Sequence, residues 1–292
     1  MTNAWPDAAW LRSRWPLPEP LTFAVVGSGL RVVDADGHAW HLKRREPARL
    51  VGELFVLAEL SDAGVRVTAP APTADGPLAY QRGGWAYWLY PELDGRPIEP
   101  IPASADAATR AAWRGLGLAT ARLQGCLRQI DPDSAERRGV PVRHASVAPA
   151  PTGVQLIHGD LHAGNVLVGD AGKVGYLDFD HLTIGPRLVD PCYASGSLLA
   201  RLLETRKAVE ERWLCLTGSL LAGWCAGWRA SGLPVTLEEL DAVPATFVEI
   251  EDDFRAWLAE SGDWAGVALT DRMNEVARRR SADLIALVRE AR

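Results

Sequence analysis

The chain has 292 residues, of which 48% are hydrophobic and 23% charged, and its formal net charge is −6. This composition is ordinary for a globular protein with a buried core, no stretch reaches the ~18 apolar residues of a membrane span, and no basic stripe exists to contact nucleic acid. The N-terminal residues also lack a signal-peptide pattern, so we expect a cytoplasmic protein that binds neither nucleic acid nor membranes.

Residues 21–43 are typical of three antiparallel strands. The apolar run LTFAVV is followed by Gly27-Ser28-Gly29, and Asp36-Gly37 separates two further alternating runs. An Asp-Gly pair between alternating runs is a strong hairpin signal. A helix is predicted next, because Pro47 suits a first helical turn, leucines share one face and Gly64 would end the helix.

Two further strands are predicted in VRVTAPAP and WAYWLYPEL, which gives an N-terminal sheet of about five strands with one helix inserted after the third. The turn at Asp94-Gly95 marks the predicted boundary between a nucleotide-binding lobe, residues 1–93, and a catalytic and substrate-binding lobe, residues 94–292.

The second lobe is predicted to be mainly helical. Helices are expected at 104–130, 190–230, 236–260 and 270–291. In the first of these, the positions expected to be buried are Trp113, Leu116, Leu118, Leu123 and Leu127. Residues 131–152 are rich in Pro, Arg and Ala and are expected to form an irregular loop, and GVQLIHGD is expected to be a short strand that runs into a loop.

The most informative chemistry lies between residues 158 and 180. Asp160 follows His158-Gly159, Asn165 comes five residues after Asp160, and Asp178 opens the triplet Asp178-Phe179-Asp180. Phosphoryl transfer needs a carboxylate that accepts or orients the hydroxyl proton, and an amide oxygen and a second carboxylate that hold magnesium against the phosphates. The protein kinase signature, H-R-D-x-x-x-x-N followed by D-F-G, has the same spacing.

The motifs HGDLHAGNVL, YLDFDH and GPRLVDP resemble those of the aminoglycoside phosphotransferase and choline kinase superfamily. The resemblance implies an α+β, bilobal protein-kinase-like fold, with a small antiparallel sheet and one helix in the N-lobe and a larger, mainly helical C-lobe. It implies ATP and Mg²⁺ as cofactors, Asp160 as the catalytic base, and Asn165 and Asp178 as metal ligands. The acceptor would be a hydroxyl of a small molecule, such as an aminoglycoside-like antibiotic, an amino alcohol or a sugar.

In the N-terminal lobe the resemblance implies a nucleotide-binding set. Lys43 ends the third strand, as does the lysine that contacts the α- and β-phosphates, and Glu53 resembles the acid that pairs with that lysine. Gly27-Ser28-Gly29 would cover the phosphates, although the full G-x-G-x-x-G is absent. The carbonyl of Pro91 and the amide of Leu93 would meet the edge of the adenine.

Three further residues flank the motif. His162 either contacts the γ-phosphate or only packs within the loop. His158 is expected to be buried and to shape the loop. Asp190 resembles the aspartate that ties the following helix to the catalytic loop.

Two other functions stay open at this point: a bacterial Ser/Thr protein kinase-like enzyme and a nucleotide-binding pseudokinase. Only about ten residues separate Asp178 from the next predicted helix, and no A-P-E motif follows, which leaves little room for a peptide-docking loop. The joint presence of Lys43, Asp160, Asn165 and Asp178 argues against a pseudokinase.

The acceptor must be recognised largely by the C-terminal helices. An acidic cluster, Glu249, Glu251, Asp252 and Asp253, either receives a cationic acceptor or forms a solvated helix face. Four tryptophans either stack on a sugar or cap a cation, or else lie in the core: Trp224, Trp228, Trp257 and Trp264.

Overall fold

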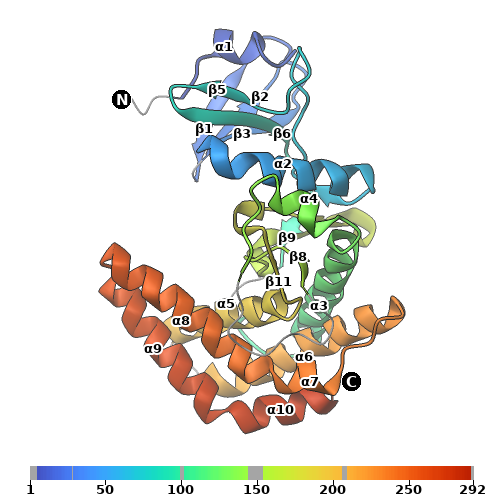
Figure 1. Ribbon diagram of the computed structural model, residues 1–292, viewed down its shortest axis with the longest axis vertical. Coiled ribbons are helices and arrows are strands. Elements are labelled where there is room, and N and C mark those ends of the chain that lie inside the picture. The colour runs from blue at the N-terminus through green and yellow to red at the C-terminus, as the bar shows by residue number, and fades with distance from the viewer. Residues whose placement is uncertain (1–4, 28, 99–101, 144–153, 206–208, 291–292) are drawn as a thin grey trace.

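The computed structural model describes residues 5–27, 29–98, 102–143, 154–205 and 209–290, which form two lobes, one above the other in Figure 1. The upper lobe contains a five-stranded antiparallel sheet with the order β1-β2-β3-β6-β5. Its strands are β1 (Thr22–Val26), β2 (Gly29–Val33), β3 (Ala39–Arg45), β6 (Trp85–Pro91) and β5 (Tyr80–Arg82).

Strand β6 shows how this sheet is covered on both faces. Tyr87 and Leu89 point into a small core that also contains Leu11 of α1 (Ala8–Arg12). The alternate residues, such as Trp88, point to the other face, where they join the main core with α2 (Pro47–Asp62). This is the period-two alternation of a strand buried on both sides. The same α2 also packs against α3 of the lower lobe, so it links the two lobes.

The sheet has the predicted number of strands, but one strand differs from the prediction. The segment VRVTAPAP contributes only β4 (Arg66–Val67), which pairs in parallel with β10 (Val174–Tyr176) in a second, four-stranded sheet. Prolines at 70 and 72 lack the N–H that a longer ladder needs. The fifth strand of the N-terminal sheet is instead β5, joined to β6 by Gly83-Gly84, both at positive φ.

The second sheet lies between the N-terminal sheet and the helices. Its order is β4-β10-β9-β7, with β9 at Val166–Val168 and β7 at Arg96–Pro97. Strand β4 lies before residue 93, but its partner β10 lies after it. Strand pairing therefore crosses the predicted boundary, and the division into lobes at 93/94 stays a prediction. A separate antiparallel pair, β8 (Gln155–Ile157) and β11 (Thr183–Gly185), supports the loop that carries Asp160.

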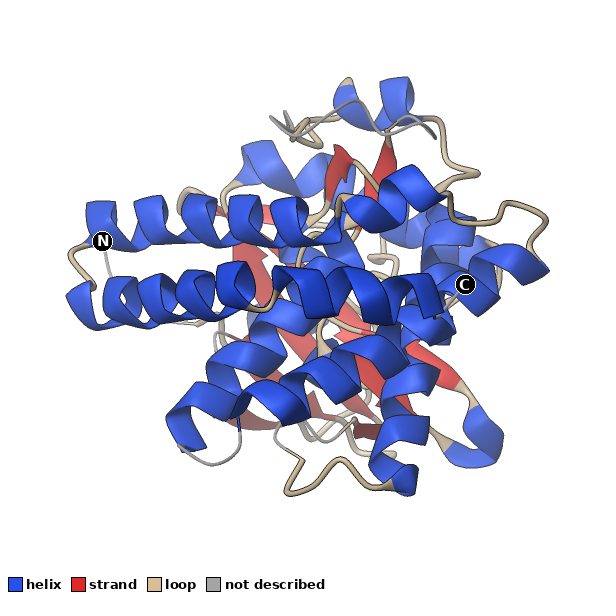
Figure 2. Ribbon diagram, turned by 90° about the horizontal axis from the view of Figure 1, so that it is seen from below, coloured by secondary structure: helices blue, strands red, loops and turns tan. Residues whose placement is uncertain are grey.

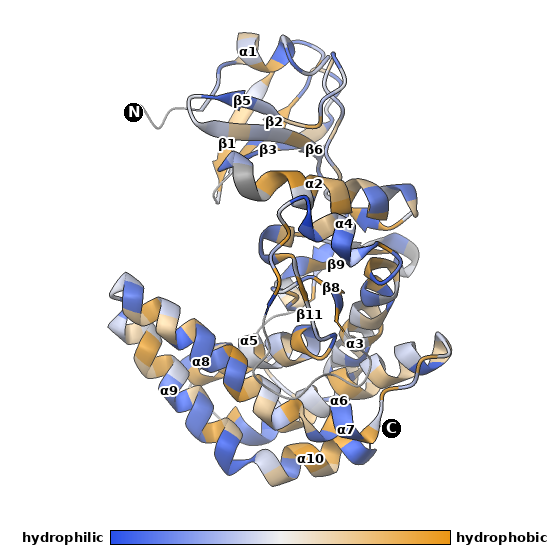
Figure 3. Cartoon of the chain, in the orientation of Figure 1, coloured by the Kyte–Doolittle hydropathy of each residue, from blue (hydrophilic) through white to orange (hydrophobic). Residues whose placement is uncertain are grey.

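The lower lobe is helical, and seen from below its helices lie in front of the strands (Figure 2). The helices are α3 (Ala107–Leu127), α4 (Pro132–Glu136), α5 (Val189–Thr205), α6 (Val209–Ala230), α7 (Leu237–Asp241), α8 (Val243–Ser261), α9 (Trp264–Arg279) and α10 (Ser281–Glu290). Along α8 and α9 the colours alternate between hydrophilic and hydrophobic, as in amphipathic helices (Figure 3). None of the described helices is long and apolar enough to cross a membrane.

Each long predicted helix of this lobe exists, with changed limits. Residues 190–205 belong to α5 and residues 209–230 to α6. The range 236–260 contains α7 and most of α8, and α9 begins at Trp264, before the predicted start at 270. In α3 four of the five predicted buried positions are buried, whereas Leu118 is half-buried. The segment 131–152 contains the short α4, and its residues 144–153 lie outside the described part. The predicted α+β bilobal fold is confirmed, with a small antiparallel sheet above a mainly helical lobe.

Candidate active site

The loop after β8 places Asp160 beside Asn165. The Asn165 amide nitrogen donates to the main-chain carbonyl of Asp160 at 3.0 Å and to its Oδ2 at 3.3 Å. Asn165 is part of a short 3₁₀ helix, η1 (Ala163–Asn165), which His162 caps by accepting the Gly164 N–H on Nδ1. Since Nδ1 accepts, the proton of the neutral His162 ring is on Nε2, which lies 3.9 Å from Asp160 Oδ1.

His158 and Asp190 hold this loop in place, as expected from the sequence. The buried Asp190 of α5 accepts the Gly159 N–H at 2.9 Å and the His158 N–H at 3.3 Å. The His158 ring makes a 2.8 Å hydrogen bond to the carbonyl of Leu177, the residue before Asp178. Burial lowers the pKa of His158, which favours the neutral ring. The loop that carries Asp160 and the loop that carries Asp178 are therefore joined by the hydrogen bond between the His158 ring and the Leu177 carbonyl.

Gly159 stands where the protein kinase signature has arginine, and the backbone explains the difference. Its φ is +80°, in the left-handed region that glycine adopts without strain. A β-carbon here would also collide with the carbonyl oxygen of His181. The close approach of these two loops therefore requires glycine.

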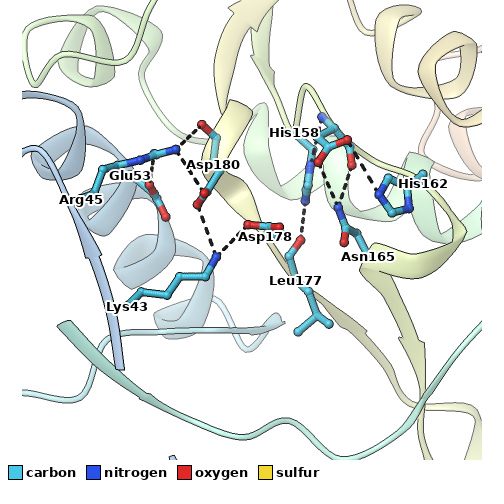
Figure 4. Close-up of polar contacts among 10 residues, drawn as sticks. Lys43, Arg45, Glu53, His158, His162, Asn165, Leu177, Asp178 and Asp180 are labelled. Atoms are coloured by element: carbon cyan, nitrogen blue, oxygen red, sulfur yellow. Dashed lines mark hydrogen bonds and ion pairs between the residues drawn. The ribbon is translucent and has the colours of Figure 1, made fainter. Parts of the chain in front are cut away.

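Lys43 reaches the Asp178 loop directly (Figure 4). Its Nζ lies 2.7 Å from Asp178 Oδ1 and 3.4 Å from Asp180 Oδ1. Burial lowers the pKa of Lys43, but the carboxylates of Asp180 and Asp178 outweigh it and raise the pKa overall. Burial raises and the Lys43 ammonium lowers the pKa of Asp178, and the net direction is downward. Both groups therefore carry their charges at neutral pH.

Asp178 also has an unusual backbone. Its φ of 59° and ψ of 67° are in the left-handed region, and it is the only non-glycine residue with positive φ in the described part of the chain. Such a conformation costs on the order of 1–3 kcal/mol for a non-glycine residue and is concentrated at functional sites. In this conformation the Asp178 carboxylate accepts the hydrogen bond from Lys43.

The expected ion pair between Lys43 and Glu53 does not form in this structure. The carboxylate of Glu53, 5% exposed, instead pairs with Arg45 at 2.7 Å. Arg45 also donates to the carbonyl of Asp180 at 2.9 Å. Burial, followed by the nearby Asp180, raises the pKa of Glu53 to about 7 against the opposing charge of Arg45. Lys43 and Arg45 share a strand face, since they are two residues apart, and the arginine takes the helix acid.

The other predicted nucleotide contacts lie at or just beyond the ends of strands of the N-terminal sheet. Gly27, with φ of +56°, follows β1, and Gly29 begins β2; Ser28 lies outside the described residues. Pro91 ends β6 opposite Trp40. The N–H of Leu93 makes no hydrogen bond to another described residue. Their roles stay predictions.

A cavity of about 350 Å³ opens beside the loop that carries Asp160, between α5, α8 and α9. His162 and Tyr193 form part of its lining. Burial first, and then the neighbouring carboxylates of Asp160 and Glu251, raise the pKa of Tyr193. Tyr193 therefore lies near both Asp160 and Glu251. Neither Tyr193 nor Arg45 was predicted from the sequence; Arg45 could have been suspected from its spacing to Lys43.

The acidic cluster of α8 divides between the surface and this cavity. Asp253 pairs with Arg143 at 2.6 Å, and Asp252 accepts the amide of Asn274 at 2.7 Å. Glu251 is 5% exposed and lines the cavity. The tryptophans divide in the same way: Trp224 and Trp228 are buried and donate to Gln124, whereas Trp257 and Trp264 are exposed.

Residues 27–149 and 143–230 match the model of the phosphotransferase enzyme family. The chain belongs to this family. Together the two matches cover more than half of the phosphotransferase, including Lys43, Asp160 and Asp178. They confirm the superfamily suggested by the sequence motifs and the enzyme class, a phosphotransferase acting on a hydroxyl group.

Comparisons with individual proteins support the fold of this phosphotransferase. An amicoumacin kinase in complex with AMP-PNP and Ca²⁺ superposes with a TM-score of 0.71 at 17% identity, covering 93% of this chain and 92% of that one. A spectinomycin phosphotransferase in complex with ADP and spectinomycin gives 0.63 at 13% identity, covering 92% and 95%.

An uncharacterized protein of Deinococcus radiodurans is 31% identical over 176 residues, which cover 50% of this chain. The match spans about half the length, 51%, of that relative.

Proposed function

We propose that this phosphotransferase moves the γ-phosphoryl group of ATP to a hydroxyl of a small molecule that carries a positive charge. The observation that supports it best is the position of Asp160. Its carboxylate is held by Asn165 and lies next to the cavity lined by His162 and Tyr193. A hydroxyl in that cavity would be within reach of the carboxylate, as a general base requires.

In the proposed reaction the acceptor oxygen attacks the γ-phosphorus and the bond from phosphorus to the bridging oxygen of ADP breaks. The hydroxyl proton goes to Asp160, and ADP leaves with the electron pair of the broken bond. Lys43 would stabilise the phosphate charge, since it is the cation nearest Asp178 among the described residues. Its raised pKa keeps that charge throughout the neutral range.

The described residues fit a magnesium ion. The side chain of Asp178 is 43% exposed, and the amide nitrogen of Asn165 is used by Asp160, which leaves the amide oxygen for an ion. Mg²⁺ prefers oxygen ligands and is usually held by one or two carboxylates together with phosphate oxygens. The ion would neutralise charge on the phosphates.

The nucleotide would lie under the N-terminal sheet. The Leu93 amide and the Pro91 carbonyl are proposed to meet the adenine edge, and the turn at Gly27 to cover the phosphates. Glu53 would act through Arg45 and not through Lys43, because Arg45 holds its carboxylate. The lobes are proposed as before, with residues 1–93 binding nucleotide and 94–292 carrying the acceptor site.

The segment after Asp178 argues for a small acceptor. Helix α5 begins at Val189, so only ten residues follow Asp178 before the helix that lines the cavity. The charge of the acceptor is inferred from Glu251, a buried carboxylate on the cavity wall.

The test is a phosphorylation screen of small hydroxyl compounds with purified protein, ATP and Mg²⁺. We expect transfer to the hydroxyl of compounds that also carry an amine, and little transfer to peptides. Consumption of ATP only with protein substrates would contradict the proposal and favour a protein kinase.

A further inference from the structure

One acidic side chain of the acceptor cavity is free to meet a ligand. Glu251 makes no hydrogen bond or ion pair with another residue in the part of the chain that the structure describes. Its Oε1 lies against Gly196 of α5, where a β-carbon would collide with it, so glycine makes room for the carboxylate. A buried carboxylate without a partner is costly, and a ligand cation would relieve that cost.

The other acidic side chains that line the cavity already have partners. Glu204 pairs with Arg201 at 3.7 Å. The carboxylate of Asp263 accepts the N–H of Gly266 at 3.0 Å as the cap of α9. In the described lining, Glu251 is therefore the only buried carboxyl group without a hydrogen bond or an ion pair.

The remaining wall near Glu251 is largely apolar. Leu258 of α8 and Leu269 and Met273 of α9 line it. Phe254, one turn after Glu251, also lines the cavity and is 46% exposed. Its ring stacks on Trp257, with centroids 5.5 Å apart and planes 17° from parallel, so the rim of the cavity is an exposed aromatic face.

We propose that the acceptor is an amphiphilic monoamine, with its hydroxyl at Asp160, its single ammonium on Glu251 and an apolar or aromatic body against Phe254. This inference rests on the proposed function, because it names the class of molecule that is phosphorylated. A polycationic aminosugar fits poorly, since all but one of its ammonium groups would meet apolar or already paired side chains.

Binding is tested by calorimetry without nucleotide, using phenylalaninol, which combines a hydroxyl, an ammonium and a phenyl ring. Phenylpropanol lacks the amine, alaninol lacks the ring, and kanamycin is a polycation. Phenylalaninol is expected to bind tighter than each of the others, on the order of ten- to a hundredfold tighter than phenylpropanol because it gains a charged hydrogen bond.

Two variants assign the contacts. Glu251→Gln should reduce the affinity for phenylalaninol to that for phenylpropanol, and Phe254→Ala should reduce it to that for alaninol. Glu260→Gln, which removes an exposed carboxylate of the same helix, is the matched control and should change neither affinity.

Three results would overturn the inference: tighter binding of kanamycin, no measurable binding of phenylalaninol, or an unchanged affinity in Glu251→Gln. Phenylalaninol that binds as expected but is never phosphorylated would instead count against the proposed function, because the binding measurement involves no nucleotide.

Discussion

Glu251→Gln is expected to change how the stability of the fold depends on pH. Burial, and then the neighbouring Asp252 carboxylate, raise the pKa of Glu251 from its ordinary value of 4.5 to about 7. One pKa unit corresponds to ~1.4 kcal/mol, so this difference is worth about 3 kcal/mol. Below about pH 4.5 this contribution to the free energy of unfolding is fully present, because Glu251 is protonated in both the folded and the unfolded chain. The contribution is lost as the pH rises through about 7, because the buried side chain must then ionise. The glutamine variant lacks this loss.

The assay compares the urea-unfolding free energies of wild type and variant at about pH 5 and about pH 8. Between these two pH values, the unfolding free energy of Glu251→Gln should increase relative to that of wild type by about 2–3 kcal/mol. Glu53, whose pKa is also raised to about 7, is present in both chains and cancels. The same holds for the charged and titratable groups that line the cavity around Glu251, which are His162, Tyr193, Arg201, Glu204 and Asp263.

The control is again Glu260→Gln, whose carboxylate is exposed and should give a shift below about 0.5 kcal/mol. A difference between Glu251→Gln and wild type that is equal at the two pH values would refute the reasoning, because Glu251 would then have the same pKa in the folded and unfolded chain.

Four other substitutions test the site. Asp160→Asn should leave nucleotide binding intact and lower kcat on the order of 10²–10⁴-fold; a turnover near wild type in steady-state kinetics would remove Asp160 from the role of base. Asp178→Ala should abolish binding of Mg·ATP in calorimetry, and an affinity and rate that both survive would assign the ion to another residue. Arg45→Met should lower the unfolding free energy by about 1–3 kcal/mol, because it leaves Glu53 buried without its partner, and adding Glu53→Gln should restore part of the loss; an equal loss in the single and double variants in urea unfolding would mean that the ion pair is not the cause. Gly159→Ala should lower both the thermal midpoint and kcat, since its φ of +80° and the His181 carbonyl exclude a side chain; a variant with wild-type melting would show that the two loops can separate at little cost.

The centre of the site could be predicted because its residues follow one another at short, chemically constrained spacings. Asp160 and Asn165 belong to one loop, and their mutual hydrogen bond depends only on local geometry. Asp178 and Lys43 come from distant segments, and Lys43 could be assigned because it lies near the end of the predicted third strand. The Lys43 and Glu53 pair could not be predicted in the same way, since Arg45 lies on the same strand face and only the position of α2 decides which cation meets the acid.

The fold shows the same limit. Hairpins are encoded locally, by Asp36-Gly37 and by Gly83-Gly84, and both exist. The pairing of β4 with β10 joins residues more than a hundred positions apart. Strand β4 has only two residues, which is too short for an alternating pattern to predict it. Long-range pairing of short strands depends on packing that a pattern does not contain.

The spacing of Glu251 along α8 encodes its inward direction and separates it from Glu249, Asp252 and Asp253. Phe247, Glu251, Phe254 and Leu258 recur at the spacing of a single helix face, and Phe247 and Leu258 are buried. A carboxylate on an apolar stripe is unfavourable for the fold, and glutamine would fill nearly the same space without the cost of burying a charge. If Glu251 only served the fold, Glu251→Gln would gain stability at about pH 8 and lose nothing. The proposed role requires both effects together: a more stable chain that no longer distinguishes an amine from the neutral compound of the same shape.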